Sequence, residues 1–284
     1  MELPLGGSLL ELERRRTGRV GALRGEWPDG AVPVKHLHGH AARGSTCGSP
    51  RRVRGLQPRG SLHVVRRLRA EGGPAWPGLA FLVHIGGHIA FDVEQIAAYC
   101  RANGIILLED CAHAHGASWD GRRPGTWGDA AIWSFAPTKT VSTGEGGMLV
   151  SANADLLESA RRFRDYGKPD YSTAGLNFRM TEFTAALGII AVERMDEIAA
   201  WKNDVARSVL DASHPARIAL PKGMTSGLYK YIVFDKIELS TGRVYSEPCH
   251  RIMRHSVSLP NTDWVAENHW CVPLYYRPHS EVGS

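Results

Sequence analysis

The chain has 284 residues, of which 43% are hydrophobic and 22% charged, which is typical of soluble globular proteins. At about 150 residues per domain, the length predicts about two domains or one large one. No apolar run approaches the roughly 18 residues that a membrane-spanning helix needs, and the first residues do not resemble a secretory signal. The five cysteines lack Cys-x-x-Cys spacing, so we expect a reduced, cytoplasmic protein that does not act at a membrane.

The formal net charge of +5 is unevenly distributed along the chain. Residues 1–80 carry a net charge of +8 and 14 of the 31 glycines, whereas the remainder carries −3. Arginine clusters such as Arg14-Arg15-Arg16 are found in nucleic-acid-binding arms, but here no aromatic platform or recognition motif accompanies them. Gly and Arg without apolar periodicity cannot build a core. We therefore expect residues 1–80 to be a basic, poorly specified head that does not bind nucleic acid.

From residue 81 onward the sequence alternates between strand and helix patterns. The apolar run 81–85 predicts a buried strand, and the capping-box pattern at 92–95 predicts a helix that ends at Asn103-Gly104. The run 105–109 predicts a second buried strand. A strand, a helix and a strand with short links form a βαβ unit, which indicates an α/β protein with parallel strands.

The later elements suggest a second, smaller unit. The patterns predict strands at 130–135 and 148–151, a helix at 153–166 capped by Asn153, mostly helix at 179–210, and strands at 229–234 and near Val272. We expect three regions: the head at 1–80, a large-domain core at 81–200, and a small C-terminal domain at 201–284.

Candidate site residues follow two predicted strands. In parallel sheets, ligands bind at the carboxyl ends of strands, and here Asp110 and His113 follow one strand while Ser134 and Lys139 follow another. A carboxylate, an imidazole, a hydroxyl and an amine suit pyridoxal phosphate, which needs a lysine for its Schiff base and a carboxylate at its pyridine nitrogen. The spacing alone is weak evidence, because a lone lysine on a loop is usually solvated.

Several residues near these strand ends are also of types that bind metals or act as nucleophiles. Glu109, Asp110, His113 and His115 are metal-ligand types, but Glu109 and Asp110 point to opposite faces of an extended strand and no second cluster has zinc spacing, so we expect no metal site. Cys111 lacks an activating motif, which favours a buried structural thiol over a nucleophile. His84 and His88 are about as consistent with a structural role as with lining a substrate pocket.

Five linked motifs resemble those of the DegT/DnrJ/EryC1/StrS aminotransferases. They are E-D-C-A-H-A-H-G at 109–116, G-R-R-P-G with G-D at 121–129, S-F-A-P-T-K with G-E-G-G at 134–147, R-D-Y-G with G-L-N-F-R-M-T-E at 164–182, and N-H-W-C-V-P at 268–273. Five motifs in the same order across about two hundred residues are far more specific than any one of them.

The resemblance implies the fold-type-I architecture of pyridoxal-phosphate-dependent aminotransferases, with a mostly parallel large-domain sheet and a smaller α+β domain. It implies that Lys139 is the Schiff-base and acid/base lysine, and that Asp110 contacts the pyridine nitrogen. His113 then lies near the ring, Ser134 binds the phosphate, and Asn177 reaches the phosphate from the partner subunit of a homodimer. The implied reaction moves an amino group, usually from glutamate, to a keto group of a nucleotide-linked deoxysugar. A smaller branch of the family aminates keto-cyclitols.

One part of the family pattern is not found. The family carries a Gly-Thr or Gly-Ser phosphate loop that opens a helix upstream of residue 84. Gly44-Ser45-Thr46 has the right residue types, but Pro50 interrupts the helix that should follow. We therefore expect an incomplete N-terminal portion, and a catalytically impaired remnant of the fold is the alternative to an active enzyme.

Overall fold

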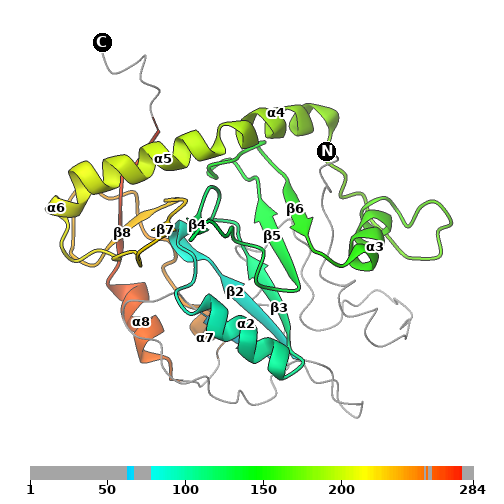
Figure 1. The fold of residues 1–284 in the computed structure, drawn as a ribbon, viewed down its shortest axis with the longest axis horizontal. Coiled ribbons are helices and arrows are strands. Elements are labelled where there is room, and N and C mark those ends of the chain that lie inside the picture. The colour runs from blue at the N-terminus through cyan, green and yellow to red at the C-terminus, as the bar shows by residue number, and fades with distance from the viewer. Residues whose placement is uncertain (1–62, 67–77, 253, 255–257, 277–284) are drawn as a thin grey trace.

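A computed structural model describes residues 63–66, 78–252, 254 and 258–276 of the chain. Of the predicted head at 1–80, residues 1–62, which include the segment 44–46, and residues 67–77 lie outside the described residues, whereas 63–66 and 79–80 belong to strands of the central sheet. A five-stranded sheet with the order β1-β2-β3-β5-β6 forms the centre of the molecule (Figure 1). Helices accompany this mixed sheet, as expected for an α/β protein.

The three central strands are parallel, and the edge strands are antiparallel to them. Strand β2 (Leu79–Val83) pairs in parallel with β3 (Ile106–Asp110), which pairs in parallel with β5 (Ala130–Ser134). The edge strands β1 (His63–Arg66) and β6 (Gly147–Val150) run antiparallel to their neighbours. Because Val83 pairs with Asp110 and Asp110 with Ile132, the carboxyl ends of β2, β3 and β5 meet at one edge.

Both faces of the sheet are covered, which explains why every residue of β3 is buried. On one face, helix α2 (Val93–Ala102) packs with Val93 and Ala97 against a cluster that contains Leu82 and Leu107. On the other face, helix α3 (Ala154–Arg164) packs against Leu108 and its neighbours. Because successive side chains of a strand point to opposite faces of the sheet, the same strands contribute to two separate apolar clusters.

The predicted helix boundaries are largely confirmed. The Asn153 side chain accepts a hydrogen bond from the Leu156 backbone N–H at 3.0 Å, as the sequence predicts for an N-cap. Asp92 takes the N-cap position of α2, but its side chain does not make the capping bond, so the predicted capping box is wrong in that respect. Gly104 follows α2 with φ of +61°, a conformation that glycine adopts without strain.

One long helical run passes along one side of the body, shown in yellow-green in Figure 1. It comprises α4 (Glu182–Glu193), α5 (Met195–Val205), a π-helical stretch (Ala206–Leu210) and α6 (Asp211–Ser213). Only Arg194 separates α4 from α5, so the helix predicted at 179–210 is confirmed apart from its first turn. No helix within the described ranges is long and apolar enough to span a membrane.

The C-terminal residues form small sheets and short helices. Strand β8 (Tyr231–Val233) pairs antiparallel with β9 (Trp270–Val272), and β4 (Ser118–Trp119) pairs antiparallel with β7 (Met224–Thr225). The short helices α7 (Cys249–Ile252) and α8 (Pro260–Glu267) lie between β8 and β9 in the sequence. The strands predicted at 229–234 and near Val272 are therefore present, although the first begins two residues later. The predicted domain boundaries stay predictions.

Candidate active site

Lys139 lies in a tight loop beyond β5 and is only 6% exposed. Its backbone N–H donates to the Ala136 carbonyl at 3.0 Å, and the Thr143 N–H donates back to the Phe135 carbonyl. The pKa of Lys139 is lowered to about 8, mainly by burial; the Asp110 carboxylate opposes this shift, and the Lys230 ammonium adds to it. A substantial fraction of this amine is therefore neutral near pH 8, unlike an ordinary lysine.

Asp110 ends β3 and is 8% exposed. One of its carboxylate oxygens accepts the backbone N–H of Ala112 at 3.0 Å. The sheet register brings this carboxylate to the same edge as the loop of Lys139, and it is near enough to raise the pKa of that amine. The structure thus brings together the two residues for which the sequence predicted complementary roles.

His113 contributes a flat side chain to the same region. Its Nδ1 accepts the backbone N–H of Gly86 at 3.3 Å, so the proton of the neutral ring is on Nε2. The imidazole stacks on the Tyr229 ring with centroids 4.1 Å apart. The turn that presents this N–H needs Gly86, whose φ is +70° and whose added Cβ would meet Ile232 at 2.6 Å.

Ser134 is half-buried at the end of β5, and its Oγ accepts the Ala136 N–H at 3.4 Å. The adjoining loop includes Gly146, whose φ of +156° and close approach to Thr143 require a residue without Cβ. Asn177 is exposed on a separate segment, where its Oδ1 accepts from the backbone and side chain of Arg179. The structure does not bring Asn177 to Lys139, and its phosphate contact from a partner subunit stays a prediction.

Glu109 faces away from Asp110, as the alternation of strand side chains predicts. Its two carboxylate oxygens accept the backbone N–H groups of Gly125, Trp127 and Gly128 at 2.8, 2.7 and 2.5 Å, and one of them contacts His84 Nε2 at 2.9 Å. Although burial opposes it, hydrogen bonding by His84 and this backbone lowers the pKa of Glu109. Glu109 therefore serves as the anchor of the loop 125–128.

The donor set around Glu109 argues against a metal ion. His84, Glu109 and Cys111 are the only group in the described part of the chain whose ligand atoms lie close enough to share one. The carboxylate is already occupied by backbone donors. Burial raises the pKa of Cys111 well above its ordinary value, so this thiol stays protonated and inert.

Several residues at this edge were not predicted from the sequence. Tyr229 contacts His113, and the amine of Lys139 lies 4.5 Å from its ring centroid. Lys202 on α5 is 7% exposed, and burial lowers its pKa to about 8. No motif flags either residue, because each reaches the site from a distant part of the chain.

Two buried histidines also line this edge. No ring nitrogen of His88 or His115 has a hydrogen-bond partner among the described residues. Burial lowers the pKa of His88 to about 4, and burial together with the charges of Lys139 and Lys202 lowers that of His115 to about 3. Both rings are therefore neutral at physiological pH, a state that the sequence does not predict.

The arrangement fits the ring side of pyridoxal phosphate. A buried amine of lowered pKa can react with an aldehyde, and a buried carboxylate next to it can hold a protonated pyridine nitrogen. His113 can contact the ring, and Ser134 can donate to a phosphate. The helix N-terminus that would complete the phosphate site is not among the described residues.

The chain is similar in sequence to known proteins over a large part of its length. Vibrio cholerae GDP-perosamine synthase is 36% identical over 129 residues, which cover 44% of this chain and 35% of that protein. The dTDP-3-amino-3,4,6-trideoxy-alpha-D-glucose transaminase of Micromonospora megalomicea is 30% identical over 223 residues, covering 68% of this chain and 59% of that enzyme. The chain therefore spans about a third to three-fifths of the length of these relatives.

The likeness extends to solved structures. The crystal structure of S. venezuelae DesV in complex with a ketimine intermediate matches with a TM-score of 0.64 and 25% identity, covering 71% of this chain and 61% of that one. The model of the DegT/DnrJ/EryC1/StrS aminotransferase family matches residues 79–226, which include the strands β2, β3 and β5 and the loop of Lys139. This match covers more than half of the chain. The chain belongs to the DegT/DnrJ/EryC1/StrS aminotransferase family.

Proposed function

We propose that this protein is a pyridoxal-phosphate-dependent aminotransferase that acts on a nucleotide-linked keto sugar. The observation that carries the proposal is the buried amine of Lys139, with a pKa of about 8, next to the buried carboxylate of Asp110. Such an amine reacts with a carbonyl near neutral pH, whereas an exposed lysine is almost fully protonated. Family members in general depend on this cofactor, which supports the assignment.

Each residue has a defined task in this proposal. When bound, the cofactor withdraws electrons from the carbon that loses or gains the amino group. Lys139 would hold the cofactor aldehyde through its neutral amine and would serve as the acid and base at the carbons that exchange the amino group. Asp110 would face the pyridine nitrogen and keep a proton there, since its buried carboxyl group lies at the same sheet edge as the loop of Lys139. His113 orients the ring with the N–H of its Nε2.

The acceptor class comes from the relatives. GDP-perosamine synthase and the dTDP-amino-sugar transaminase are both named for nucleotide-linked sugars. We propose the same class for this chain, with glutamate as the amino donor. The described cysteines, Cys100, Cys111, Cys249 and Cys271, are free thiols, in keeping with the cytoplasmic location that we propose.

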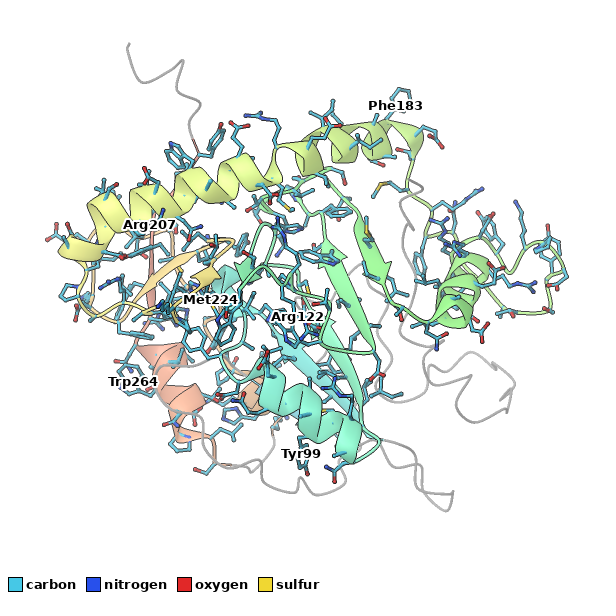
Figure 2. The ribbon with its side chains drawn as sticks, in the orientation of Figure 1. Tyr99, Arg122, Phe183, Arg207, Met224 and Trp264 are labelled. Carbon is cyan, nitrogen blue, oxygen red and sulfur yellow. The ribbon has the colours of Figure 1, made fainter. Side chains whose placement is uncertain are left out.

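We further propose a homodimer in which the outer face of α4 is covered by a second copy. Phe183 is 87% exposed, Leu187 56% and Ile190 57%, and α4 buries only Gly188. Figure 2 shows Phe183 projecting from the outer side of the helix. An apolar helix face of this kind is characteristic of an interface. A partner would also supply its own Asn177, a residue that is exposed and accepts a hydrogen bond from the Arg179 backbone within one copy.

Cofactor attachment is the first test. Purified protein with added pyridoxal phosphate should show a visible absorption band that Lys139→Ala removes. Borohydride reduction followed by peptide mass spectrometry should place the pyridoxyl group on Lys139. Lys222→Ala, at an exposed position before β7, is the matched control and should leave the band unchanged. An unmodified chain without a band at saturating cofactor would be the impaired remnant of the fold.

Amino transfer is the second test. Glutamate added to the cofactor-loaded protein should bleach the visible band and release one equivalent of 2-oxoglutarate. A keto sugar linked to GDP or dTDP should then restore the band and acquire the amino group. Restoration by a keto-inositol and not by a nucleotide sugar would assign the chain to the keto-cyclitol branch.

A further inference from the structure

Two consecutive residues of α5 are buried and contact different segments of the site. The Lys202 amine donates to the Thr140 hydroxyl at 3.2 Å, and Thr140 directly follows Lys139. The Asn203 amide donates to the Ser226 carbonyl at 2.6 Å and accepts the Ser226 N–H at 3.3 Å. One turn of α5 thus holds both the lysine loop and the segment that begins at Ser226.

The segment 226–230, here called the strap, packs closely against the turn Ile85–Gly87 that follows β2. The Ser226 hydroxyl donates to the Gly87 carbonyl at 3.0 Å, and the Gly227 N–H donates to the same carbonyl at 2.9 Å. A Cβ on Gly87 would lie 2.7 Å from the Leu228 nitrogen, and one on Gly227 would lie 2.4 Å from the His115 carbonyl oxygen. The backbone approach is therefore possible only with glycine at both positions.

The strap carries Tyr229 to the other side of the lysine loop. The Tyr229 hydroxyl is 2.9 Å from the Thr138 hydroxyl, and Thr138 directly precedes Lys139. The same ring stacks on His113 and lies under the Lys139 amine. Lys139 is therefore flanked by two threonines, each of which is held by a residue from a distant part of the chain.

These contacts close into one circuit around the reactive amine. It runs from Lys202 to Thr140, through Lys139 to Thr138, on to Tyr229, and back along the strap to Asn203. Lys202 belongs to none of the ion pairs in the described ranges, so its burial carries an electrostatic cost without a carboxylate to offset it. Because burying the Lys202 ammonium lowers the stability of the fold, we infer that this residue has a role other than stabilisation.

We propose that Lys202 and Tyr229 are positioning residues that hold the Lys139 loop from both sides and keep its amine buried. The inference deepens the proposed function, because the held group is the lysine that would bind the cofactor. Loosening either side lets water reach the amine. Hydration favours the ammonium form, and the amine then loses reactivity at neutral pH.

The test measures the amine itself, without cofactor. Trace acetylation of the full chain across a pH series, read by peptide mass spectrometry, gives the apparent pKa of Lys139. We expect Thr138→Val and Thr140→Val each to raise it by about one unit, which lowers the neutral fraction near pH 7.5 about eightfold. The charged or titratable neighbours to be considered are Asp110, His113, His115, Lys202, Tyr229 and Lys230.

Pairs of substitutions separate positioning from general damage. Tyr229→Phe combined with Thr138→Val should shift the pKa no more than the larger single change, because both members remove the same hydrogen bond. Lys202→Met combined with Thr140→Val should shift it no more than Lys202→Met alone, which removes the bond to Thr140 together with a positive charge. Tyr99→Phe and Lys222→Met, at exposed positions, are the controls. Shifts below about 0.3 unit in both threonine variants, or additive shifts in the pairs, would overturn the proposal.

The outcome is independent of the cofactor test. A chain that never binds pyridoxal phosphate still reports the pKa of Lys139 by acetylation, so the proposed function can fail while the positioning role holds. Conversely, a visible band that Lys139→Ala removes, together with an unchanged pKa in every variant, would sustain the function and reject the positioning role.

Discussion

The edge of the sheet where β2, β3 and β5 end buries titratable side chains, whereas the outer face of α4 exposes apolar ones. At the ends of β2, β3 and β5, titratable side chains such as Asp110, Lys139 and His115 are at least nine-tenths buried. On α4, apolar side chains such as Phe183 and Ile190 face outward. Buried charge and exposed hydrocarbon both cost free energy in the isolated chain.

This comparison indicates that the two regions suit different kinds of binding partner. Polar groups that converge in a confined space suit a small charged molecule, whereas an apolar helix face suits another protein surface. The two regions should therefore respond differently to substitution. Changes at the edge should alter the free energy of unfolding strongly, and changes on α4 should alter association while leaving that free energy nearly constant.

The largest effect is expected from Glu109→Gln. The amide would direct an N–H toward backbone donors that now share a carboxylate, so buried groups would be left unpaired. We expect a loss of about 3–5 kcal/mol in the free energy of unfolding, measured by chemical denaturation. Glu158→Gln, on the exposed side of α3, is the control and should change little. A loss below about 1 kcal/mol would show that the carboxylate does not anchor the loop 125–128.

The next effect has the opposite sign. Lys202→Met should stabilise the protein at neutral pH by about 2 kcal/mol, because removing a buried charge outweighs the lost bond to Thr140. The pKa of Lys202 is lower in the folded state than in the unfolded state. Its penalty is therefore complete below pH 8 and is relieved as the pH rises toward 10.5.

The stability curves of the two proteins should therefore converge as the pH rises from 8 to 10.5. Lys222→Met, at an exposed position, should show no such pH-dependent difference. An equal stability of the Lys202→Met variant and the unmodified protein across the whole range would mean that the amine is hydrated in the folded state.

The smallest effect on unfolding is expected on α4. Leu187→Ser and Ile190→Ser should each change the free energy of unfolding of the monomer by no more than about 0.5 kcal/mol, because both side chains are already more than half exposed. Together they should shift the molar mass in solution from dimer to monomer, as measured by light scattering. Tyr99→Ser, on the exposed side of α2, should leave the mass unchanged. A monomer in every case would reject the α4 interface.

Much of the fold could be predicted because it rests on local patterns. The apolar runs around β2 and β3, the Asn153 cap and the glycine after α2 each act within a few residues. The common location of Asp110, His113 and Lys139 was also predictable, because strand ends in parallel sheets share an edge, whereas their roles were assigned from the family motifs.

The rest of the site depends on contacts between distant segments. Tyr229 meets Thr138 across 91 positions, and Lys202 meets Thr140 across 62, and no local pattern encodes such pairs. Likewise, helical spacing predicts helix over 179–210, but the part that forms α4 is apolar on nearly all sides. The sequence therefore does not indicate which side the fold leaves exposed.

The continuity of α4 with α5 has a thermodynamic consequence. After only Arg194, α4 passes into α5, which carries Lys202 and Asn203. In the proposed dimer, a second copy that covers α4 would therefore also steady the loop of Lys139. By reciprocity, cofactor attachment should tighten the dimer by the same factor by which dimerisation tightens cofactor binding. Dilution would then release the cofactor, and loss of the cofactor would loosen the pair.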